Sequence, residues 1–233
     1  MKIAITGERG FIGKHLTHYF RNILKYEVIE LGRDYLEKLS LLDELDWLIH
    51  GACIHRHNEP EKVLLLNREI TNSTLECLRK NNLHCNITLL SSFHEDIDTP
   101  YGQSKREAKL MFKEYCQSNN TEFISLKMPN VFGKYATPYK TSFVANFCYN
   151  LHNELPVSFN QNKITLCYID EVVTIIAKFK EVEIPLTETS VDEVYFLLLK
   201  YKELVLNNEF PELKTKLELN LYQTYLDYTN YKL

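Results

Sequence analysis

The chain has 233 residues, of which 45% are hydrophobic and 25% charged, and its formal net charge is −4. This length is enough for one full domain or one domain with a small lobe, and the composition is that of a soluble globular protein. The mixed charge does not indicate a nucleic-acid surface, no apolar run approaches a membrane span, and the N-terminus lacks the pattern of a signal peptide. The six cysteines have no Cys-x-x-Cys spacing and indicate neither a metal site nor a disulfide framework, so we expect a cytoplasmic protein with reduced thiols.

The first predicted elements are a strand at Lys2 to Thr6 and a helix at Lys14 to Leu24, with three of the seven glycines of the chain in the turn between them. This pattern is typical of dinucleotide binding. Gly7 permits the tight turn, Gly10 lets the backbone approach a pyrophosphate, and Gly13 lets the helix pack closely. The alternative is a glycine-bearing turn without a ligand.

A second predicted strand, Tyr26 to Leu31, ends just before Arg33, where dinucleotide folds recognise the adenosine ribose. A basic residue there accommodates a 2′-phosphate and favours NADP, whereas an acidic residue favours NAD. Arg33 together with Arg9 in the glycine turn predicts two guanidinium groups near one phosphate, and therefore NADPH. Asp34 keeps NAD open, and a solvated loop cation is the alternative for Arg33.

Strand and helix patterns alternate through the next hundred residues. The expected strands are Trp47 to Ala52, Asn86 to Leu90 and Glu122 to Lys127, and the expected helices are 62–80 and 101–119. This alternation predicts parallel strands joined by right-handed crossovers, and hence an α/β fold with a Rossmann-type doubly wound parallel sheet.

The alternation loosens after Gly133. Helical patterns occupy 142–151, a segment starting at Ile169, and 191–206, and a strand pattern occupies 162–168. We therefore assign residues 1–133 to an NADP-binding Rossmann domain. Residues 134–233 are assigned mainly to a small C-terminal substrate-binding lobe, with segments at about 160–182 returning to the Rossmann domain.

Tyr101 and Lys105 are four residues apart and share one face of a predicted helix. A lysine cation beside a phenol lowers the phenol pKa from about 10, so that the tyrosine can exchange a proton with a carbonyl or hydroxyl oxygen. Ser92, at a strand end nine residues earlier, could hydrogen-bond the same oxygen. A surface pair on an amphipathic helix is the alternative, but the order of glycine turn, serine, tyrosine and lysine favours catalysis.

This order resembles the extended short-chain dehydrogenase/reductase family, in the branch that modifies sugar nucleotides. The matching segments are Thr6 to Gly13, His50 to Ala52, Asn67, Ser91-Ser92, Tyr101 to Lys105, and Pro129 to Gly133. Within the family, the chain is similar to the reductase domain of bifunctional capsular-polysaccharide enzymes, which epimerise and then reduce a UDP-2-acetamido-2,6-dideoxy-4-ketohexose. That likeness runs through Lys127 to Lys134, Asn146 to Tyr149, Ile164 to Asp170 and Leu221 to Leu226.

The resemblance implies an NADPH-dependent reductase of the C4 ketone of such a UDP-sugar, with a product of the L-talo or L-quinovo type. In this reaction Tyr101 would protonate the C4 oxygen, Lys105 would hold the nicotinamide ribose and lower the pKa of Tyr101, and Ser92 would orient the ketone. The implied cofactor-binding residues are Gly7, Arg9, Gly10, Phe11, Ile12, Arg33, Ala52, Tyr101 and Lys105. The implied substrate-binding residues are Ser92, Arg56, Asn130, Lys134 and Tyr139. No metal is implied, and a homodimer is expected.

The chain departs from these relatives at two points. They carry a cupin domain after the reductase, whereas this chain stops at Leu233, so we expect epimerisation to be done by another protein or not at all. Phe93 and His94 follow Ser92 where a 4,6-dehydratase has an Asp-Glu pair, so dehydration is not expected. Two alternatives stay open: an epimerase that retains NAD, which Arg33 disfavours, and a non-catalytic NADP-binding protein, which the intact Ser92, Tyr101 and Lys105 disfavour.

Overall fold

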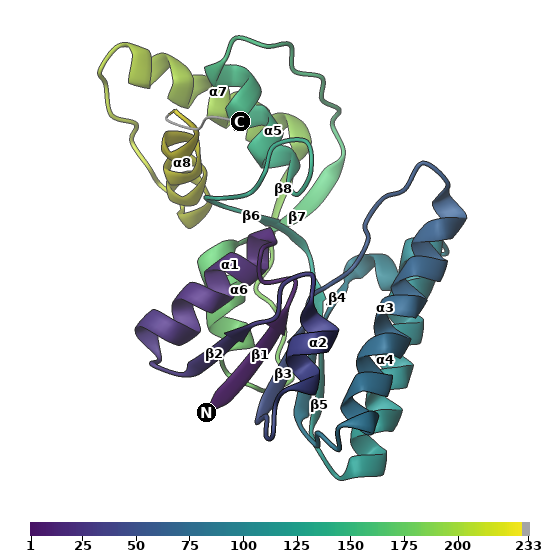
Figure 1. The fold of residues 1–233 in the computed structure, drawn as a ribbon. Coiled ribbons are helices and arrows are strands. Elements are labelled where there is room, and N and C mark those ends of the chain that lie inside the picture. Colours follow the sequence, from purple (N-terminus) through teal and green to yellow (C-terminus); the bar gives the residue numbers. More distant parts are fainter. Residues whose placement is uncertain (230–233) are drawn as a thin grey trace. The chain divides into compact units, whose positions relative to one another are not determined.

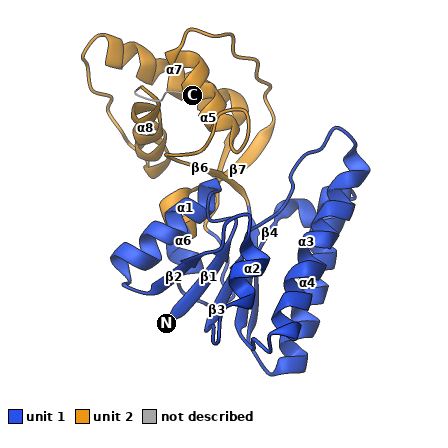
Figure 2. Cartoon of the chain, in the orientation of Figure 1, with its two compact units in different colours: residues 1–128, 173–184 blue, residues 129–172, 185–233 orange. Residues whose placement is uncertain are grey.

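The computed structural model describes residues 1–229, which form two compact units (Figures 1 and 2). Unit 1 comprises Met1–Met128 and Val173–Ile184, and unit 2 comprises Pro129–Val172 and the chain from Pro185 onward. The chain therefore passes between the units three times. The predicted assignment of cofactor binding to one part and substrate binding to the other remains a prediction.

Unit 1 contains a five-stranded parallel sheet, which confirms the predicted α/β fold. Its strands are β1 (Lys2–Thr6), β2 (Glu27–Glu30), β3 (Trp47–His50), β4 (Asn86–Ser92) and β5 (Phe123–Met128), in the order β2-β1-β3-β4-β5. The chain leaves β1 for β2 on one side and returns past β1 to β3 on the other. The carboxyl ends of β1 and β3 thus form a topological switch point, where sheets of this kind bind ligands.

Helices cover both faces of this sheet because its strands are apolar on both sides. On one face lie α2 (Tyr35–Ser40), α3 (Pro60–Lys80) and α4 (Pro100–Asn119), whose Leu39, Leu75 and Phe112 pack with Leu48 of β3 in one buried cluster. Helix α1 (Phe11–His18), continued by a π-helical turn at Tyr19–Ile23, contributes Phe20 to the other face. Figure 1 shows α3 and α4 running side by side, away from α1.

The returning segment 173–184 completes unit 1 with an aromatic side chain. The ring of Phe179 stacks on Phe20, with centroids 5.7 Å apart, and lies 4.5 Å from the ring of Trp47. Segments more than 130 residues apart in the sequence therefore share one core.

Unit 2 combines a small sheet with three helices. Strand β6 (Asn130–Phe132) pairs parallel with β7 (Lys163–Tyr168), which pairs antiparallel with β8 (Thr187–Ser190). Helix α6 (Ile169–Ile176) follows β7 and leads the chain back to unit 1. The helices α5 (Phe143–His152), α7 (Val191–Leu206) and α8 (Lys216–Tyr228) pack on one another and bury Cys148, Leu198, Tyr201, Leu221 and Tyr225.

Candidate active site

The turn between β1 and α1 is shaped to receive a phosphate group. Gly7 has φ +76°, a left-handed conformation that favours glycine, and the Gly10 N–H donates to the Gly7 carbonyl at 2.9 Å. A Cβ atom on Gly13 would lie 2.2 Å from the Gly7 carbonyl oxygen, so α1 can pack against the turn only because residue 13 is glycine. The positive end of the α1 dipole stands behind the turn, which fits a dinucleotide pyrophosphate. Phe11, buried, and Ile12, half-buried, form the first turn of α1.

Thr6 joins this turn to the end of β3. Its Oγ1 accepts hydrogen bonds from the backbone N–H groups of Gly51 and Ala52, both at 3.1 Å, and lies 3.2 Å from His50 Nδ1. A Cβ atom on Gly7 would meet the Ala52 nitrogen at 3.0 Å. Ala52 therefore lies beside the glycine turn at the switch point, while its predicted contact with a cofactor stays a prediction.

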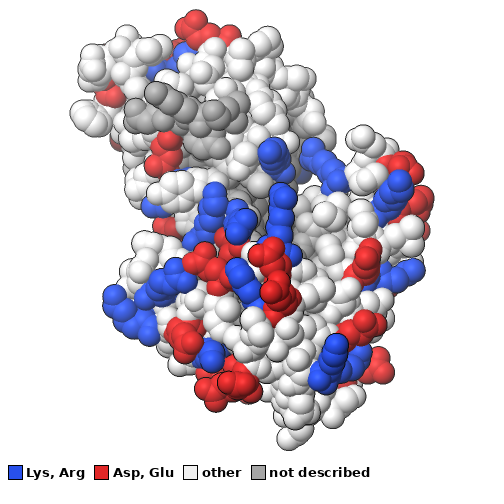
Figure 3. Space-filling view, in the orientation of Figure 1, with Lys and Arg blue, Asp and Glu red and all other residues white. Residues whose placement is uncertain are grey.

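Basic side chains gather where β2 ends. A Cβ atom on Gly32 would lie 3.4 Å from both Arg9 Nη2 and Lys38 Nζ, so these two cations converge next to the exposed Arg33. Lys38 also donates to the Glu30 carbonyl at 3.1 Å. Figure 3 shows Lys and Arg side chains on the face near the start of α1, with acidic side chains beside them. Sequence reasoning missed Lys38 because α2 is too short for a periodic pattern.

The structure brings Ser92, Tyr101 and Lys105 together at the carboxyl end of β4. Ser92 acts on the Tyr101 hydroxyl to lower its pKa, and the Ser92 Oγ accepts from the His94 N–H at 3.2 Å. Lys105 Nζ lies 5.6 Å from the centroid of the Tyr101 ring and donates to the Leu90 carbonyl at 3.0 Å. The three side chains thus share one site, and their catalytic roles remain predictions.

The start of α4 explains this convergence. Thr99 caps the helix by accepting from the Gly102 N–H at 3.1 Å, and Pro100 occupies the first helical turn. A Cβ atom on Gly102 would lie 2.2 Å from the His94 carbonyl oxygen, so the helix starts directly against the turn that follows Ser92. A larger residue at position 102 would force the start of α4 and the turn after Ser92 apart.

Ser91 and Glu95, which are close to Ser92 in the sequence, hydrogen-bond to each other, and Glu95 also binds nearby lysines. Ser91 is buried and donates its hydroxyl to the carboxylate of Glu95. That carboxylate also binds Lys109 at 3.2 Å and Lys127 at 3.0 Å. Burial opposes ionisation of Glu95, but these hydrogen bonds outweigh it and lower the pKa of the carboxyl group. A carboxylate held in this way is a poor proton donor.

Cys53 and His55, which sequence reasoning did not assign to the site, lie beside Tyr101. Cys53 Sγ is 3.4 Å from His55 Nε2, and the charge of Cys53 acts on the Tyr101 hydroxyl. The His55 and Tyr101 ring centroids are 5.4 Å apart. No local sequence pattern signals this cluster, because it depends on β3 lying next to β4.

The pKa values in this cluster differ from the prediction. Burial raises the pKa of Tyr101, and the negative charge of Cys53 raises it further, while the hydrogen bond with Ser92 lowers it. The pKa of Tyr101 is thus raised overall, and the lowering by Lys105 that the resemblance implies stays a prediction. Burial alone would raise the pKa of the Cys53 thiol, but Lys105 and His55 outweigh burial and bring that pKa to about 6.

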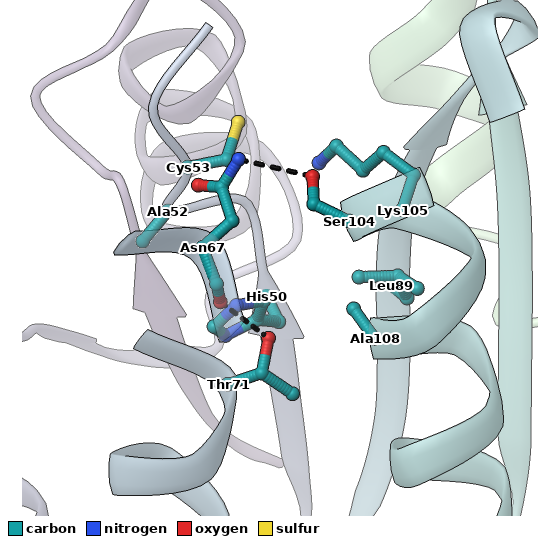
Figure 4. A pocket seen from close by; sticks show the side chains of 9 residues that line it. All are labelled: His50, Ala52, Cys53, Asn67, Thr71, Leu89, Ser104, Lys105 and Ala108. Carbon is teal, nitrogen blue, oxygen red and sulfur yellow. Dashed lines mark hydrogen bonds between the residues drawn. The ribbon is translucent and has the colours of Figure 1, made fainter. Parts of the chain in front are cut away.

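A small cavity adjoins the cluster (Figure 4). Figure 4 shows the Cys53 and Lys105 side chains near one end of it and the hydrogen bond from Asn67 to Ser104, 3.1 Å long, across it. The lining residues are His50, Ala52, Cys53, Asn67, Thr71, Leu89, Ser104, Lys105 and Ala108. The cavity is polar at the end that faces the candidate catalytic groups.

The other predicted substrate residues lie outside this cluster. Arg56 is exposed in the loop after β3. Asn130, Lys134 and Tyr139 belong to unit 2, where Asn130 donates to the Thr165 carbonyl at 3.3 Å and the Tyr139 hydroxyl donates to Asn150. Their role in binding a sugar nucleotide stays a prediction. Across residues 1–229, no group of three or more His, Cys, Asp or Glu side chains is placed to hold a metal ion.

The doubly wound sheet, the glycine turn at its switch point and the adjoining Tyr101 and Lys105 define the architecture of a dinucleotide-binding protein. The sequence profile of the NAD dependent epimerase/dehydratase family matches residues 3–183. The chain belongs to this family, and an NAD(P) dinucleotide is the cofactor expected of it.

Two relatives resemble the whole chain. The UDP-2-acetamido-2,6-beta-L-arabino-hexul-4-ose reductase of Pseudomonas aeruginosa is 28% identical over 241 residues, which cover 98% of this chain and 65% of that relative. The chain thus spans just under two thirds of that protein. The structure of the capsular polysaccharide assembling protein CapF from Staphylococcus aureus matches with a TM-score of 0.84 and 28% identity, over 100% of this chain and 68% of that chain.

A more distant structure shares the fold alone. RMD from Pseudomonas aeruginosa, solved in complex with NADPH, matches with a TM-score of 0.80 at 15% identity, over 98% of both chains. None of the helices in the described part of the chain is both long enough and apolar enough to cross a membrane.

Proposed function

We propose that the chain is an NADPH-dependent reductase of the C4 ketone of a UDP-2-acetamido-2,6-dideoxy-4-ketohexose. Its product would be a UDP-N-acetyl-6-deoxyhexosamine of the L-talo or L-quinovo type, used in polysaccharide or glycan synthesis. The name of the Pseudomonas relative supports a substrate of this class, and the name of the Staphylococcus relative supports a role in polysaccharide assembly. The substrate is part of the proposal, because the chain spans only 65% of the curated relative.

The observation that favours a reductase over an epimerase is the partly buried position of Tyr101 beside His55 and Cys53. Burial and the adjacent Cys53 raise the pKa of this phenol and keep it protonated at neutral pH. Reduction of a ketone needs a proton donor at the oxygen that becomes a hydroxyl, which a neutral phenol provides. An epimerase must first take a proton from a sugar hydroxyl, for which a phenol of raised pKa is a poor base.

Each residue of the site has a place in this proposal. Ser92 and Tyr101 would hold the ketone oxygen by hydrogen bonds, and Tyr101 would give it a proton. Lys105, anchored on the Leu90 carbonyl, would bind the nicotinamide ribose. Bound NADPH supplies the hydride. The residues that would hold it are the glycine turn for the pyrophosphate and Arg9, Arg33 and Lys38 for the 2′-phosphate.

The test is NADPH absorbance with purified protein and UDP-2-acetamido-2,6-dideoxy-4-ketohexoses of the D-xylo, L-arabino and L-lyxo series. We expect one of them to be reduced, and Tyr101→Phe to lower kcat by roughly 10²–10⁴-fold with NADPH binding retained. Tyr19→Phe, which removes a phenol at the far end of α1 from the glycine turn, is the control and should react normally. Full activity of Tyr101→Phe would refute the assigned proton donor, and failure to bind NADPH would favour the NAD-retaining epimerase.

A further inference from the structure

The loop that follows β3 connects Tyr101 to the surface of unit 1. The thiol of Cys53, which is half-buried, adjoins the Tyr101 hydroxyl, and its sulfur lies 3.4 Å from Nε2 of His55. His55 is exposed, whereas Tyr101 is only partly accessible. His55 and Cys53 thus form a hydrogen-bonded pair beside Tyr101, which is the proton donor under the proposed function, and the His55 end of the pair reaches the surface.

The loop is held in place by Asn67 of α3. Its Oδ1 accepts from the Ile54 N–H at 2.7 Å, and its Nδ2 donates to the Ile54 carbonyl at 2.9 Å. The same Nδ2 reaches Ser104 of α4 at 3.1 Å. Ile54 stands between Cys53 and His55 in the sequence, so this clamp fixes both side chains relative to the helix that carries Tyr101.

The charges around Cys53 favour a thiolate paired with an imidazolium. The groups that face it are His55 on its own loop and Lys105 and Tyr101 on α4, and Arg56 adds positive charge near His55. Lys105 and His55 lower the pKa of the thiol to about 6, and the hydrogen bond to Cys53 raises the pKa of His55. The mobile proton therefore rests on the exposed imidazole rather than on sulfur.

We propose that His55 and Cys53 form a proton relay that returns a proton from solvent to Tyr101 after each reduction. This inference rests on the proposed reductase function. Both are positioning residues, since they act through Tyr101 and not on the substrate.

The relay balances without any change of oxidation state. Tyr101 loses its proton to the ketone oxygen and becomes a phenolate. The Nε2–H bond of His55 then breaks as its proton passes to the Cys53 sulfur, and the proton on sulfur passes to the phenolate oxygen. Imidazolium and phenolate become imidazole and phenol, the thiolate is restored, and water reprotonates His55.

His94 is the competing proton source. Its ring lies on Tyr101 at a centroid distance of 5.9 Å in an edge arrangement, and it is also exposed. Cys53 and Ser92 shift the pKa of Tyr101, whereas His94 is not among the causes of that shift. A relay through His94 is therefore the alternative that a variant at position 94 tests.

The kinetic test compares Cys53→Ala, His55→Ala and His94→Ala with the controls Cys77→Ala on α3 and His57→Ala on the same loop. We expect the first two to lower kcat about ten-fold or more with KM unchanged, and the others to match wild type. Added imidazole should restore His55→Ala but not Cys53→Ala, because only the first retains the sulfur next to Tyr101. Rescue is a result that a merely structural role of His55 would not produce.

A second measurement does not depend on turnover. The ultraviolet thiolate absorbance and the rate of alkylation by iodoacetamide, in which a carbon–sulfur bond forms as iodide leaves, report the ionisation of Cys53. We expect wild type to show a thiolate with a midpoint near pH 6, and His55→Ala to shift that midpoint upward. Alkylation of Cys53 at neutral pH that is no faster than that of Cys77 would overturn the relay.

The outcomes separate the relay from the reductase. If wild type reduces a keto-sugar while Cys53→Ala does so equally well, or imidazole fails to rescue His55→Ala, the relay is wrong and the reductase stands. If wild type reduces none of the keto-sugars, the proposed function fails, and the relay that rests on it fails with it.

Discussion

The acid–base behaviour of Tyr101 is set by burial and by Cys53 more than by the lysine one helical turn away. The spacing of Tyr101 and Lys105 predicts a lowered phenol pKa, yet the pKa of Tyr101 is raised, because the phenol is buried beside the thiol of Cys53. Lys105 instead lowers the pKa of Cys53. Spacing along a helix identifies which side chains are close together, but burial and the third partner decide which of them is ionised.

We expect the buried His50 to make the free energy of unfolding depend on pH in the acid range. Burial, and then the charge of Lys105, lower its pKa from 6.5 to about 3. Between these values the unfolded chain binds a proton that the folded chain does not, so the free energy of unfolding falls as the pH falls through this range. The slope approaches about 1.4 kcal/mol per pH unit.

Urea unfolding at about pH 7 and about pH 5 measures this slope. We expect His50→Asn to remove the contribution, whereas His57→Asn, on the exposed loop, should keep it. An unchanged difference between the two pH values in His50→Asn would show that other groups cause the acid sensitivity.

We expect the cations at the end of β2, Arg33 and Lys38, to make the protein prefer NADPH to NADH. Arg33→Ala and Lys38→Ala should each raise the Kd for NADPH about ten-fold and leave the Kd for NADH unchanged, because only NADPH carries the 2′-phosphate. Lys62→Ala on α3 serves as the control for loss of one positive charge. The Kd values are measured by titration of intrinsic fluorescence. An equal rise in the Kd for NADPH and for NADH would show that these cations do not contact the 2′-phosphate.

At the scale of elements, close backbone approaches at glycines fix the two helices that frame the site. Gly13 lets α1 contact the glycine turn, and Gly102 lets α4 start against the turn after Ser92. Both contacts join a helix to the carboxyl end of a strand. The positions of the candidate phosphate site and of Tyr101 therefore depend on residues that have no side chain.

Gly13→Ala should impair both folding and cofactor binding. The added Cβ would lie 2.2 Å from the Gly7 carbonyl oxygen and 2.6 Å from the Glu8 Cα, both backbone atoms that cannot rotate away. We expect a loss of about 1–3 kcal/mol in the free energy of unfolding, and weaker NADPH binding. Gly10→Ala is the matched control, because a Cβ atom on residue 10 would meet only the Gly7 carbonyl oxygen, at 3.0 Å. This variant should lose less free energy of unfolding than Gly13→Ala. An equal stability of the two variants in urea would contradict this account.

Most of unit 1 could be predicted from its sequence, because buried strands alternate with amphipathic helices long enough to show a period. The strands β1 and β4 and the helices α3 and α4 of unit 1, and helix α7 of unit 2, match their predicted ranges within about two residues at each end. Helix α1 starts at Phe11 and not at Lys14, because glycine at position 13 packs inside the helix rather than ending the turn. The short elements α2, β6 and β8 have too few residues to show a period.

Helix α8 and the cluster around Tyr101 were not predicted from the sequence, for different reasons. Helix α8 lies in a polar, tyrosine-rich stretch, but the capping box formed by Thr215 and Glu218 marks its start and could have revealed it. The cluster of Cys53, His55 and Tyr101 has no such marker. It arises from strand order in the sheet and from the Asn67 clamp, and neither is encoded in a local pattern.

At the scale of the whole molecule, the predicted ligand contacts divide between the two units. The glycine turn, Arg33, Ser92, Tyr101 and Lys105 lie in unit 1, whereas Asn130, Lys134 and Tyr139 lie in unit 2. If the proposed function holds, mutations in the two units should affect different ligands.

Lys134→Ala should raise the KM for the UDP-sugar about ten-fold with little change in the Kd for NADPH, because a lysine that contacts a diphosphate contributes a charge-assisted hydrogen bond. Lys140→Ala, an exposed lysine in the same loop region, is the control. A change in the Kd for NADPH with an unchanged KM for the UDP-sugar would show that Lys134 does not bind the substrate.

The returning segment 173–184 has a consequence for synthesis on the ribosome. Its Phe179 packs against Phe20 and Trp47, so the core of unit 1 lacks one of its rings until that residue has emerged. All five strands of the parallel sheet are translated by Met128, and 44 residues of unit 2 follow before Val173. The nascent sheet must therefore wait, with an apolar face incompletely covered, while nearly half of another unit is translated. Apolar surface that is exposed during this interval makes a nascent chain prone to aggregation, which chaperones counteract.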